Sequence, residues 1–207
     1  MLPQQIEEKS FQLIDERVSS HSFNQQEWTI VRRMIHATVD FDLVQTTTFH
    51  PEALSRGIAA LKAGAPIITD TRMVKAGISL KRLRKYKTKI LCAIARADVI
   101  REARSTGKTR AATAMHKLAD ELGGSIVAIG NAPTALFELL EIAEKKSRRP
   151  ALIVGVPVGL VGARESKELL IKSGIPSITV RGEKGGSPLA ASIINGLAQL
   201  AGKQNDD

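Results

Sequence analysis

The 207-residue sequence is poor in aromatic residues and contains a single cysteine, Cys92. One cysteine excludes a disulfide framework and any metal site built from several thiolates. No apolar run reaches the roughly 18 residues that a membrane span needs. The first residues also lack the basic and apolar regions of a signal peptide. These absences predict a cytoplasmic protein without a membrane segment.

Motifs of common enzyme classes are missing as well. The segment Gly107–Thr109 resembles the end of a phosphate-binding loop, but Glu102 stands where the first glycine of that motif is required. The four histidines do not have the spacing of metal ligands. No serine lies in the G-x-S-x-G turn of a hydrolase. We therefore expect no metal, no cofactor and no activated nucleophile.

Positive charge is what the sequence has in excess. It carries 30 Lys and Arg against 21 Asp and Glu, a net charge of +9. The segment Arg72–Arg110 holds 13 basic and two acidic residues, whereas the rest of the chain has a net charge of −2. Such a zone is typical of a protein with an anionic partner. Tyr86 is its only aromatic residue, which argues against single-stranded nucleic acid, because such proteins stack bases on several rings. A small polyanionic ligand and a solvated basic face both stay open.

The hydrophobic pattern predicts two parts within one domain spanning residues 1–207. Residues 1–65 have the pattern of helices, with a capping box at Asn24 and Glu27 and a third helix over Pro51–Ala63. From residue 66 to 201, β-rich runs alternate with amphipathic helices, and residues 203–207 have the composition of a flexible tail. The expected strands are Pro66–Asp70, Thr88–Ala95, Ser125–Gly130, Pro150–Val156 and Pro176–Arg181. The expected helices between and after them are Ala97–Thr106, Thr109–Leu122, Pro133–Lys146, Ala163–Ser173 and Pro188–Ala201.

This alternation predicts an α/β fold with a doubly wound, mainly parallel open sheet of about five strands and helices on both faces. In such sheets ligands bind beyond the carboxyl ends of the strands. The segments expected there are rich in glycine and polar residues, and each leads toward a helix amino terminus, which favours anions. They are Thr69–Thr71, Gly130–Pro133, Gly155–Gly159 and Arg181–Ser187. Together they predict a rim that binds carboxylate or phosphate groups.

His36 is the candidate for proton transfer. It lies three residues after Arg33, so the two side chains are neighbours on one helix. Ile35 belongs to the apolar stripe of that helix, which leaves His36 pointing away from the core. An imidazole can give or take a proton at neutral pH. From the residues alone, a structural or surface histidine is the favoured interpretation.

Five segments, taken together, resemble those of the precorrin-8X methylmutases. They occur in matching order and span nearly the whole chain, from about Ser10 to Leu200. The segments are Arg33–His36, Ile68–Val74, Gly130–Leu136, Gly155–Lys167 and Arg181–Ser187. The resemblance implies an isomerase of cobalamin biosynthesis that moves a methyl group from C-11 to C-12 of precorrin-8X or cobalt-precorrin-8, giving hydrogenobyrinate or cobyrinate. It also implies a homodimer, with the polycarboxylate tetrapyrrole bound near the subunit interface.

The same resemblance implies roles for particular residues. His36 matches the histidine that protonates or hydrogen-bonds a ring nitrogen. The residues that match substrate-contacting positions are Ser10, Arg33, Thr109 and Arg110. The pocket candidates within the shared segments are Asp70, Asn131, Gly185, Gly186 and Ser187. The run Lys81–Lys87 is more basic than the family pattern requires, and its role stays open.

Two other functions remain as alternatives. A corrinoid-binding protein without catalytic activity would use the same pocket to hold the acidic product. A basic nucleic-acid-binding protein would use the Arg72–Arg110 zone, and its affinity would fall steeply with salt.

Overall fold

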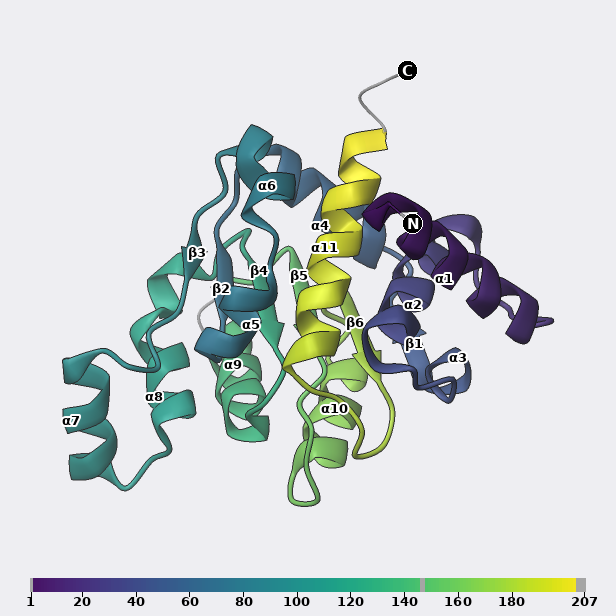
Figure 1. Ribbon diagram of the computed structural model, residues 1–207. Helices are drawn as coiled ribbons and strands as arrows, with labels where there is room; N and C mark the ends of the chain where they lie inside the picture. Colours follow the sequence, from purple (N-terminus) through teal and green to yellow (C-terminus); the bar gives the residue numbers. More distant parts are fainter. Residues whose placement is uncertain (1, 146–147, 204–207) are drawn as a thin grey trace.

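The computed structural model describes residues 2–145 and 148–203. Its centre is a six-stranded sheet with the strand order β1-β6-β5-β4-β2-β3 (Figure 1). The strands are β1 (Thr47–Phe49), β2 (Ile67–Thr69), β3 (Ile90–Leu91), β4 (Ile126–Ile129), β5 (Leu152–Gly155) and β6 (Ser177–Val180). β2 to β6 pair in parallel, and β1 pairs with β6 in the antiparallel direction. The mainly parallel α/β fold expected from the alternating pattern is confirmed.

Each of the five predicted strands is present, because continuous apolar runs such as Ile126–Ile129 are buried on both faces of the sheet. Two expectations about strands were wrong. The expected strand Thr88–Ala95 shortens to the two paired residues of β3. β1 adds a sixth strand inside residues 1–65, which were expected to be helical throughout. This edge strand has only three residues, too few to show an alternating pattern in the sequence.

Helices cover both faces of the sheet (Figure 1). One face carries α2 (Gln25–Thr38), α4 (Ala53–Lys62), α5 (Arg72–Gly77) and α11 (Ser187–Lys203), and these share a core with alternate residues of the strands. The other face carries α7 (Ala97–Thr106), α8 (Arg110–Lys117), α9 (Pro133–Lys145) and α10 (Ala163–Lys172). Successive strand residues point to opposite faces, so Val127 joins the second core while Ile126 and Ala128 join the first.

The remaining elements lie outside these layers. α1 (Pro3–Arg17) packs on α2, and α3 (Leu43–Thr46) leads from α2 to β1. α6 (Leu80–Leu83) and the 3-10 turn η1 (Arg84–Tyr86) lie within the basic zone, and neither was predicted. The single helix expected over Thr109–Leu122 divides into α8 and the 3-10 turn η2 (Ala119–Glu121).

The start of α2 and its contact with α11 fix the helix on which His36 lies. The Asn24 side chain accepts hydrogen bonds from the N–H groups of Gln26 and Glu27, and Glu27 returns one from the N–H of Asn24, which confirms the predicted capping box. α2 lies close against α11 at Gly196, where a Cβ would come within 2.6 Å of the Cδ1 atom of Ile30. A larger residue would therefore require the end of the Ile30 side chain to shift.

Two further expectations concern the chain ends and membranes. Lys203 is the last residue of α11, and the other residues of the expected tail, 204–207, lie outside the described residues, as does Lys146 of the helix expected to end there. Across the described residues, no helix combines the length and the apolar character needed to cross a bilayer.

Candidate active site

A groove of about 680 Å³ runs between α1 and α2 and contains His36. Its wall is largely apolar, with a few polar side chains. The lining residues are Ser10, Leu13, Ile14, Glu16, Arg17, Ile35, His36, Val39 and Phe41. A groove of this size with few polar groups suits a large, mainly apolar ligand that is oriented by particular contacts.

His36 occupies the last turn of α2 as its periodicity predicted: Ile35 is buried and His36 is exposed. Its ring lies against Phe11 of α1, with ring centroids 5.2 Å apart. Neither ring nitrogen has a hydrogen-bond partner within the described residues, so both are free to meet a ligand. Ser10 lines the same groove and donates its hydroxyl proton to the carbonyl of Ile6, which leaves its oxygen as an acceptor.

Arg33 lies beside the groove but does not line it. Its guanidinium donates to Glu7 of α1 at 3.2 Å and to Gln199 of α11 at 2.7 Å. Burial, and then the positive charge of Arg82, lower the pKa of Arg33, while Glu7 opposes this shift. Arg33 thus joins three helices, α1, α2 and α11, and the structure does not place it with His36 as a ligand-facing pair.

Asp70 lies at the carboxyl end of β2 and is completely buried. Its carboxylate accepts three backbone N–H groups of the loop after β4, from Gly130 at 3.1 Å, Asn131 at 2.8 Å and Ala132 at 2.9 Å. Burial raises the pKa of Asp70, and the three N–H donors oppose that shift. The carboxylate therefore fixes the loop that carries Asn131, and its hydrogen-bonding capacity is used inside the protein.

The predicted loop at Gly185–Ser187 is also closely packed. A Cβ on Gly185 would lie 2.3 Å from the carbonyl oxygen of Val156, so no larger residue fits there. Gly186 has φ of +129° and donates its N–H to that same carbonyl at 2.8 Å. Ser187 is 7% exposed, and its hydroxyl lies 3.3 Å from that of Thr71. These residues hold the loops after β2, β5 and β6 together.

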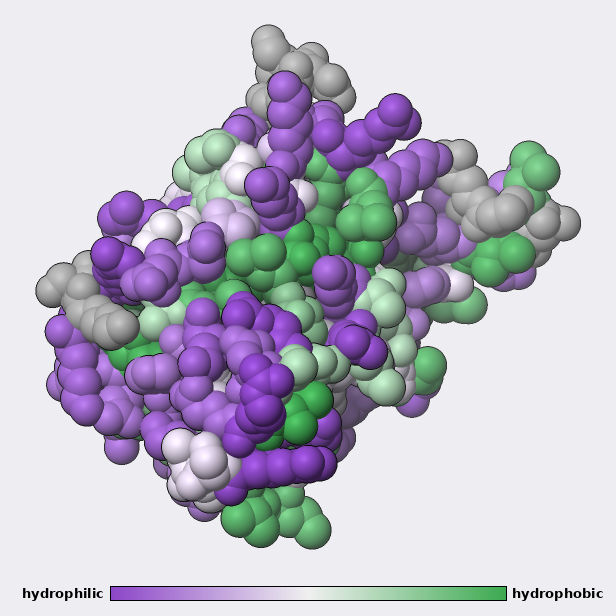
Figure 2. Space-filling model, turned by 90° about the vertical axis from the view of Figure 1, so that its left-hand side faces the viewer, coloured by the Kyte–Doolittle hydropathy of each residue, from purple (hydrophilic) through white to green (hydrophobic). Residues whose placement is uncertain are grey.

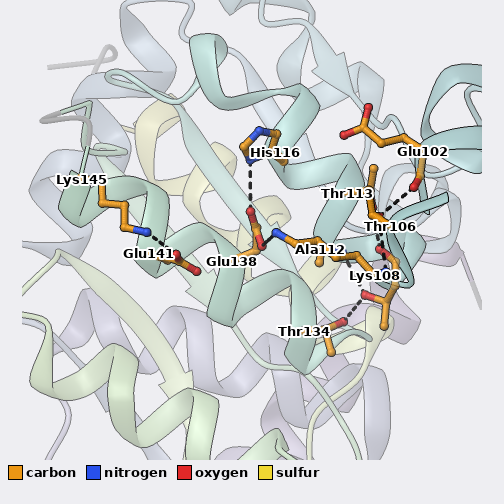
Figure 3. Close-up of polar contacts among 11 residues, drawn as sticks. Glu102, Thr106, Lys108, Ala112, Thr113, His116, Thr134, Glu138, Glu141 and Lys145 are labelled. Carbon is orange, nitrogen blue, oxygen red and sulfur yellow. Dashed lines mark hydrogen bonds and ion pairs between the residues drawn. The ribbon is translucent and has the colours of Figure 1, made fainter. Parts of the chain in front are cut away.

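Thr109 and Arg110 begin α8 on the opposite face of the sheet. The Thr109 hydroxyl accepts the N–H of Ala112 and lies 2.8 Å from the hydroxyl of Thr134 on α9. Figure 3 shows Glu138 of α9 between Lys108 and His116, each 3.2 Å away. This network fixes the start of α8 while leaving Arg110 exposed.

An apolar loop projects beyond the carboxyl edge of the sheet. It connects β5 to α10 and forms the lowest point of the molecule in Figure 1. Its side chains Leu160 and Val161 are 90% and 88% exposed. Seen from the α7 side in Figure 2, an apolar knob stands out at the bottom of the molecule. Leu160 and Val161 therefore expose apolar surface at the tip of this loop.

The predicted site residues therefore form two groups in one chain. The groove group contains Ser10 and His36, with Arg33 behind them. The second group lies along the carboxyl edge and at the start of α8, and it consists of Asp70, Asn131, Thr109, Arg110 and Gly185–Ser187. In Figure 1, α2 and α8 lie on opposite sides of the molecule.

A link between the groups comes from Lys184, which was not predicted. Its ammonium contacts Asp40 at 2.9 Å and Asp42 at 2.7 Å, just after α2. Lys167 of α10, also not predicted, donates to the carbonyl of Lys184 at 2.7 Å. Both lie within segments that the sequence analysis singled out, but charged residues near loops are usually solvated, and their sequence positions do not reveal these partners.

The basic run Lys81–Lys87 does not join either group. Lys81, Arg82, Arg84, Lys85 and Lys87 line a separate groove with the last turns of α11. That groove lies at the amino edge of the sheet, because η1 precedes β3 and α11 ends there. The run is therefore no part of the rim at the strand carboxyl ends. Within the described residues, no cluster of three His, Cys, Asp or Glu side chains could hold a metal ion.

Known proteins are similar to this chain over most of its length. The sequence profile of the precorrin-8X methylmutase family matches residues 5–200. A cobalt-precorrin-8 methylmutase of Leptospira interrogans is 45% identical to this chain, and the aligned region covers 99% of this chain and 97% of the relative. A precorrin-8X methylmutase of Pseudomonas aeruginosa is 47% identical over 80% of each chain.

A solved structure agrees with the sequence comparison. The precorrin-8X methylmutase of Thermus thermophilus superposes with a TM-score of 0.89 at 39% identity, covering 96% of this chain and 98% of the other. The similarity thus extends over nearly the whole fold. The chain belongs to the precorrin-8X methylmutase family, isomerases of cobalamin biosynthesis.

Proposed function

We propose that this protein moves a methyl group from C-11 to C-12 of precorrin-8X or cobalt-precorrin-8, with His36 as the group that acts on the macrocycle. The observation that carries this proposal is an exposed imidazole that has no hydrogen-bond partner among the described residues and lies in an apolar groove of about 680 Å³. Relatives with either substrate name are similar to this chain, so both forms are candidates. The relatives' names favour catalysis over simple corrinoid binding.

The chemistry requires little beyond positioning and one proton donor. In the methyl shift one C–C bond breaks at C-11 while another forms at C-12, within one molecule and without an added oxidant or nucleophile. His36 would protonate or hydrogen-bond a ring nitrogen and so draw electrons toward it as the methyl group migrates. The apolar wall around Leu13 and Ile14 would hold the macrocycle and exclude water.

The substrate carries several carboxylates, and the groove has too few cationic side chains to bind them all. Arg110 is exposed at the start of α8, where the helix amino terminus also favours an anion. Arginine binds a carboxylate through two parallel hydrogen bonds, which would orient the macrocycle. We therefore assign Arg110, with Thr109 beside it, to carboxylate binding.

A homodimer would bring the two groups of site residues together. The helices that carry His36 and Arg110, α2 and α8, lie on opposite sides of one chain in Figure 1, so a site that uses both residues is more readily built from two subunits. The exposed side chains Val39, Leu160 and Val161 offer apolar surface next to the site for such a contact. The cytoplasmic location, expected because the sequence lacks a signal peptide, a membrane span and a disulfide framework, stays a prediction.

The first test is a conversion assay with the metal-free and cobalt-containing substrates, followed through the absorption spectrum of the corrin product. Wild-type protein is expected to form the corrin with at least one of them. Failure with both substrates, in protein shown to bind the product, would contradict the proposal and favour a corrinoid-binding protein.

A second test asks whether the site is shared between subunits. His36→Ala and Arg110→Met are each expected to be nearly inactive as homodimers. After the two variants are mixed and allowed to exchange subunits, a heterodimer with shared sites contains one intact site, and about a quarter of the wild-type turnover should return. If no turnover returns although subunit exchange is shown by mass spectrometry, the site lies within one chain.

A further inference from the structure

Lys167 is a buried lysine for which the proposed reaction provides no role. Its side chain lies on α10 and the residue is 1% exposed. The ammonium donates to the carbonyl oxygen of Lys184 at 2.7 Å. No carboxylate lies within ion-pair distance of it among the described residues, and the nearby Glu183 is paired with Arg164 at 2.8 Å. Lys167 is therefore a buried cation bound to a single neutral acceptor.

Stability alone does not require this arrangement. Burial of a charge without a counter-ion is unfavourable, and an apolar side chain of similar volume is often as stable or more so. Burial lowers the pKa of Lys167 from 10.5 to about 8, and the charge of Glu183 opposes this shift.

The ammonium holds one peptide group of the Arg181–Ser187 loop. This peptide joins the carbonyl of Lys184 to the N–H of Gly185. On either side of it the loop is fixed by other hydrogen bonds. The backbone carbonyl of Glu183 accepts the N–H of Gly159 at 3.1 Å, and the N–H of Gly186 donates to the carbonyl of Val156 at 2.8 Å. Lys167 thus fixes the peptide between these two anchors.

The N–H at the other end of that peptide is available to a ligand. Gly185 is partly exposed, and within the described residues its N–H has no hydrogen-bond partner. A cation bound to a carbonyl oxygen polarises the peptide and strengthens the hydrogen bond that its N–H can donate. Because Gly185 packs against the carbonyl oxygens of Val156 and Pro157, the peptide has little freedom to turn once its carbonyl is held.

We infer that Lys167 is a positioning residue that holds and polarises the Lys184–Gly185 peptide, so that the Gly185 N–H binds a carboxylate of the tetrapyrrole. The identity of the carboxylate rests on the proposed function. The orientation of the peptide does not depend on it. Lys167 itself does not touch the substrate. Its effect is on binding rather than on the methyl shift.

Substrate and product binding test this role. Lys167→Met keeps the side-chain volume and removes the ammonium, and it should raise KM and the dissociation constant of the corrin product about tenfold while kcat stays within about twofold. Lys167→Arg keeps a charged donor and should restore most of the affinity. Lys172→Met is the matched control, because it removes an exposed lysine five residues later on the same helix, and it should leave both constants unchanged.

The amide proton of Gly185 gives a readout that needs no substrate. In Lys167→Met its NMR resonance should move upfield, because the peptide is less polarised, whereas Lys172→Met should leave it in place. Lys167→Gln, which retains a neutral donor, replaces Lys167→Met if that variant does not fold, and it should show the same changes at smaller size. Unchanged product affinity and an unchanged Gly185 resonance in a folded variant would overturn the inference. Absent turnover in wild-type protein would instead contradict the proposed function.

Discussion

The α1–α2 groove and the carboxyl edge of the sheet differ in whether their polar residues are hydrogen-bonded within the protein. In the groove, His36 is exposed and its ring nitrogens have no partner within the described residues. At the edge, all three hydrogen bonds of the Asp70 carboxylate go to backbone N–H groups, and Ser187 is buried beside Thr71. A polar group that the fold already satisfies shapes a site, whereas a group that the fold leaves free can act on a ligand.

This contrast separates residues that the sequence placed together. Arg33 and His36 are three residues apart on α2, yet Arg33 is held by Glu7 and Gln199 while His36 faces the groove. We expect the first to affect the packing of the helices and the second to affect the chemistry. Substitutions in the two regions should therefore differ in what they change, turnover in one and stability in the other.

The largest expected effect is on turnover in the groove. His36→Ala should lower kcat by about 10³-fold, the middle of the range for loss of a general acid. The midpoint of thermal unfolding should hardly change, because the side chain is exposed and makes no hydrogen bond in the described residues. His21→Ala is the control, since it removes another exposed histidine, one that stacks on Trp28 outside the groove. A folded His36→Ala enzyme with wild-type kcat would remove His36 from the mechanism.

The next effect is on stability at the carboxyl edge. Asp70→Ala leaves three backbone N–H groups without an acceptor, of which those of Gly130 and Ala132 are buried, and should lower the free energy of unfolding by about 3 kcal/mol. Urea denaturation would measure this loss. Asp120→Ala removes an exposed aspartate paired with Arg148 and should change the same free energy by less than about 0.5 kcal/mol. Equal stability of the two variants would show that the Asp70 network does not hold the loop.

The smallest effect, about 2 kcal/mol between pH 7.5 and 9.5, is a pH dependence that comes from Lys167. Its pKa is about 8 in the folded protein and near 10.5 when unfolded, so between these values the unfolded chain binds more protons. Stability of the wild type relative to Lys167→Met should therefore rise with pH from about 8 to about 10.5, by at most about 1.4 kcal/mol per pH unit, and be lowest below pH 8. Urea midpoints of both proteins at pH 7.5 and 9.5 would measure it. A gap between them that stays constant or narrows with rising pH would contradict the assignment.

Local sequence pattern was enough for most of the sheet. The central strands β4 and β5 are buried on both faces and therefore appear as continuous apolar runs, and the capping box at Asn24 is read from two residues. β1 was missed because it has three residues, and its pairing with β6, more than a hundred residues away, is what makes it a strand. α5 and α6 were missed because they are short and their basic side chains obscure the apolar periodicity that indicates a helix.

The sequence by itself determined which residues could be reactive. Its helical period placed Ile35 in the core and His36 outside it, and its glycines and charges indicated an anionic ligand at the strand ends. Only the tertiary structure decided which of those residues are free. The N–H donors of Asp70 lie about 60 residues further along the chain, and the acceptor of Lys167 lies on the loop after β6. Local spacing in the sequence therefore reveals neither partner. Hydrogen bonds between distant segments depend on the packed arrangement of the strands and helices, and that arrangement consumes some polar groups and leaves others, such as His36, available.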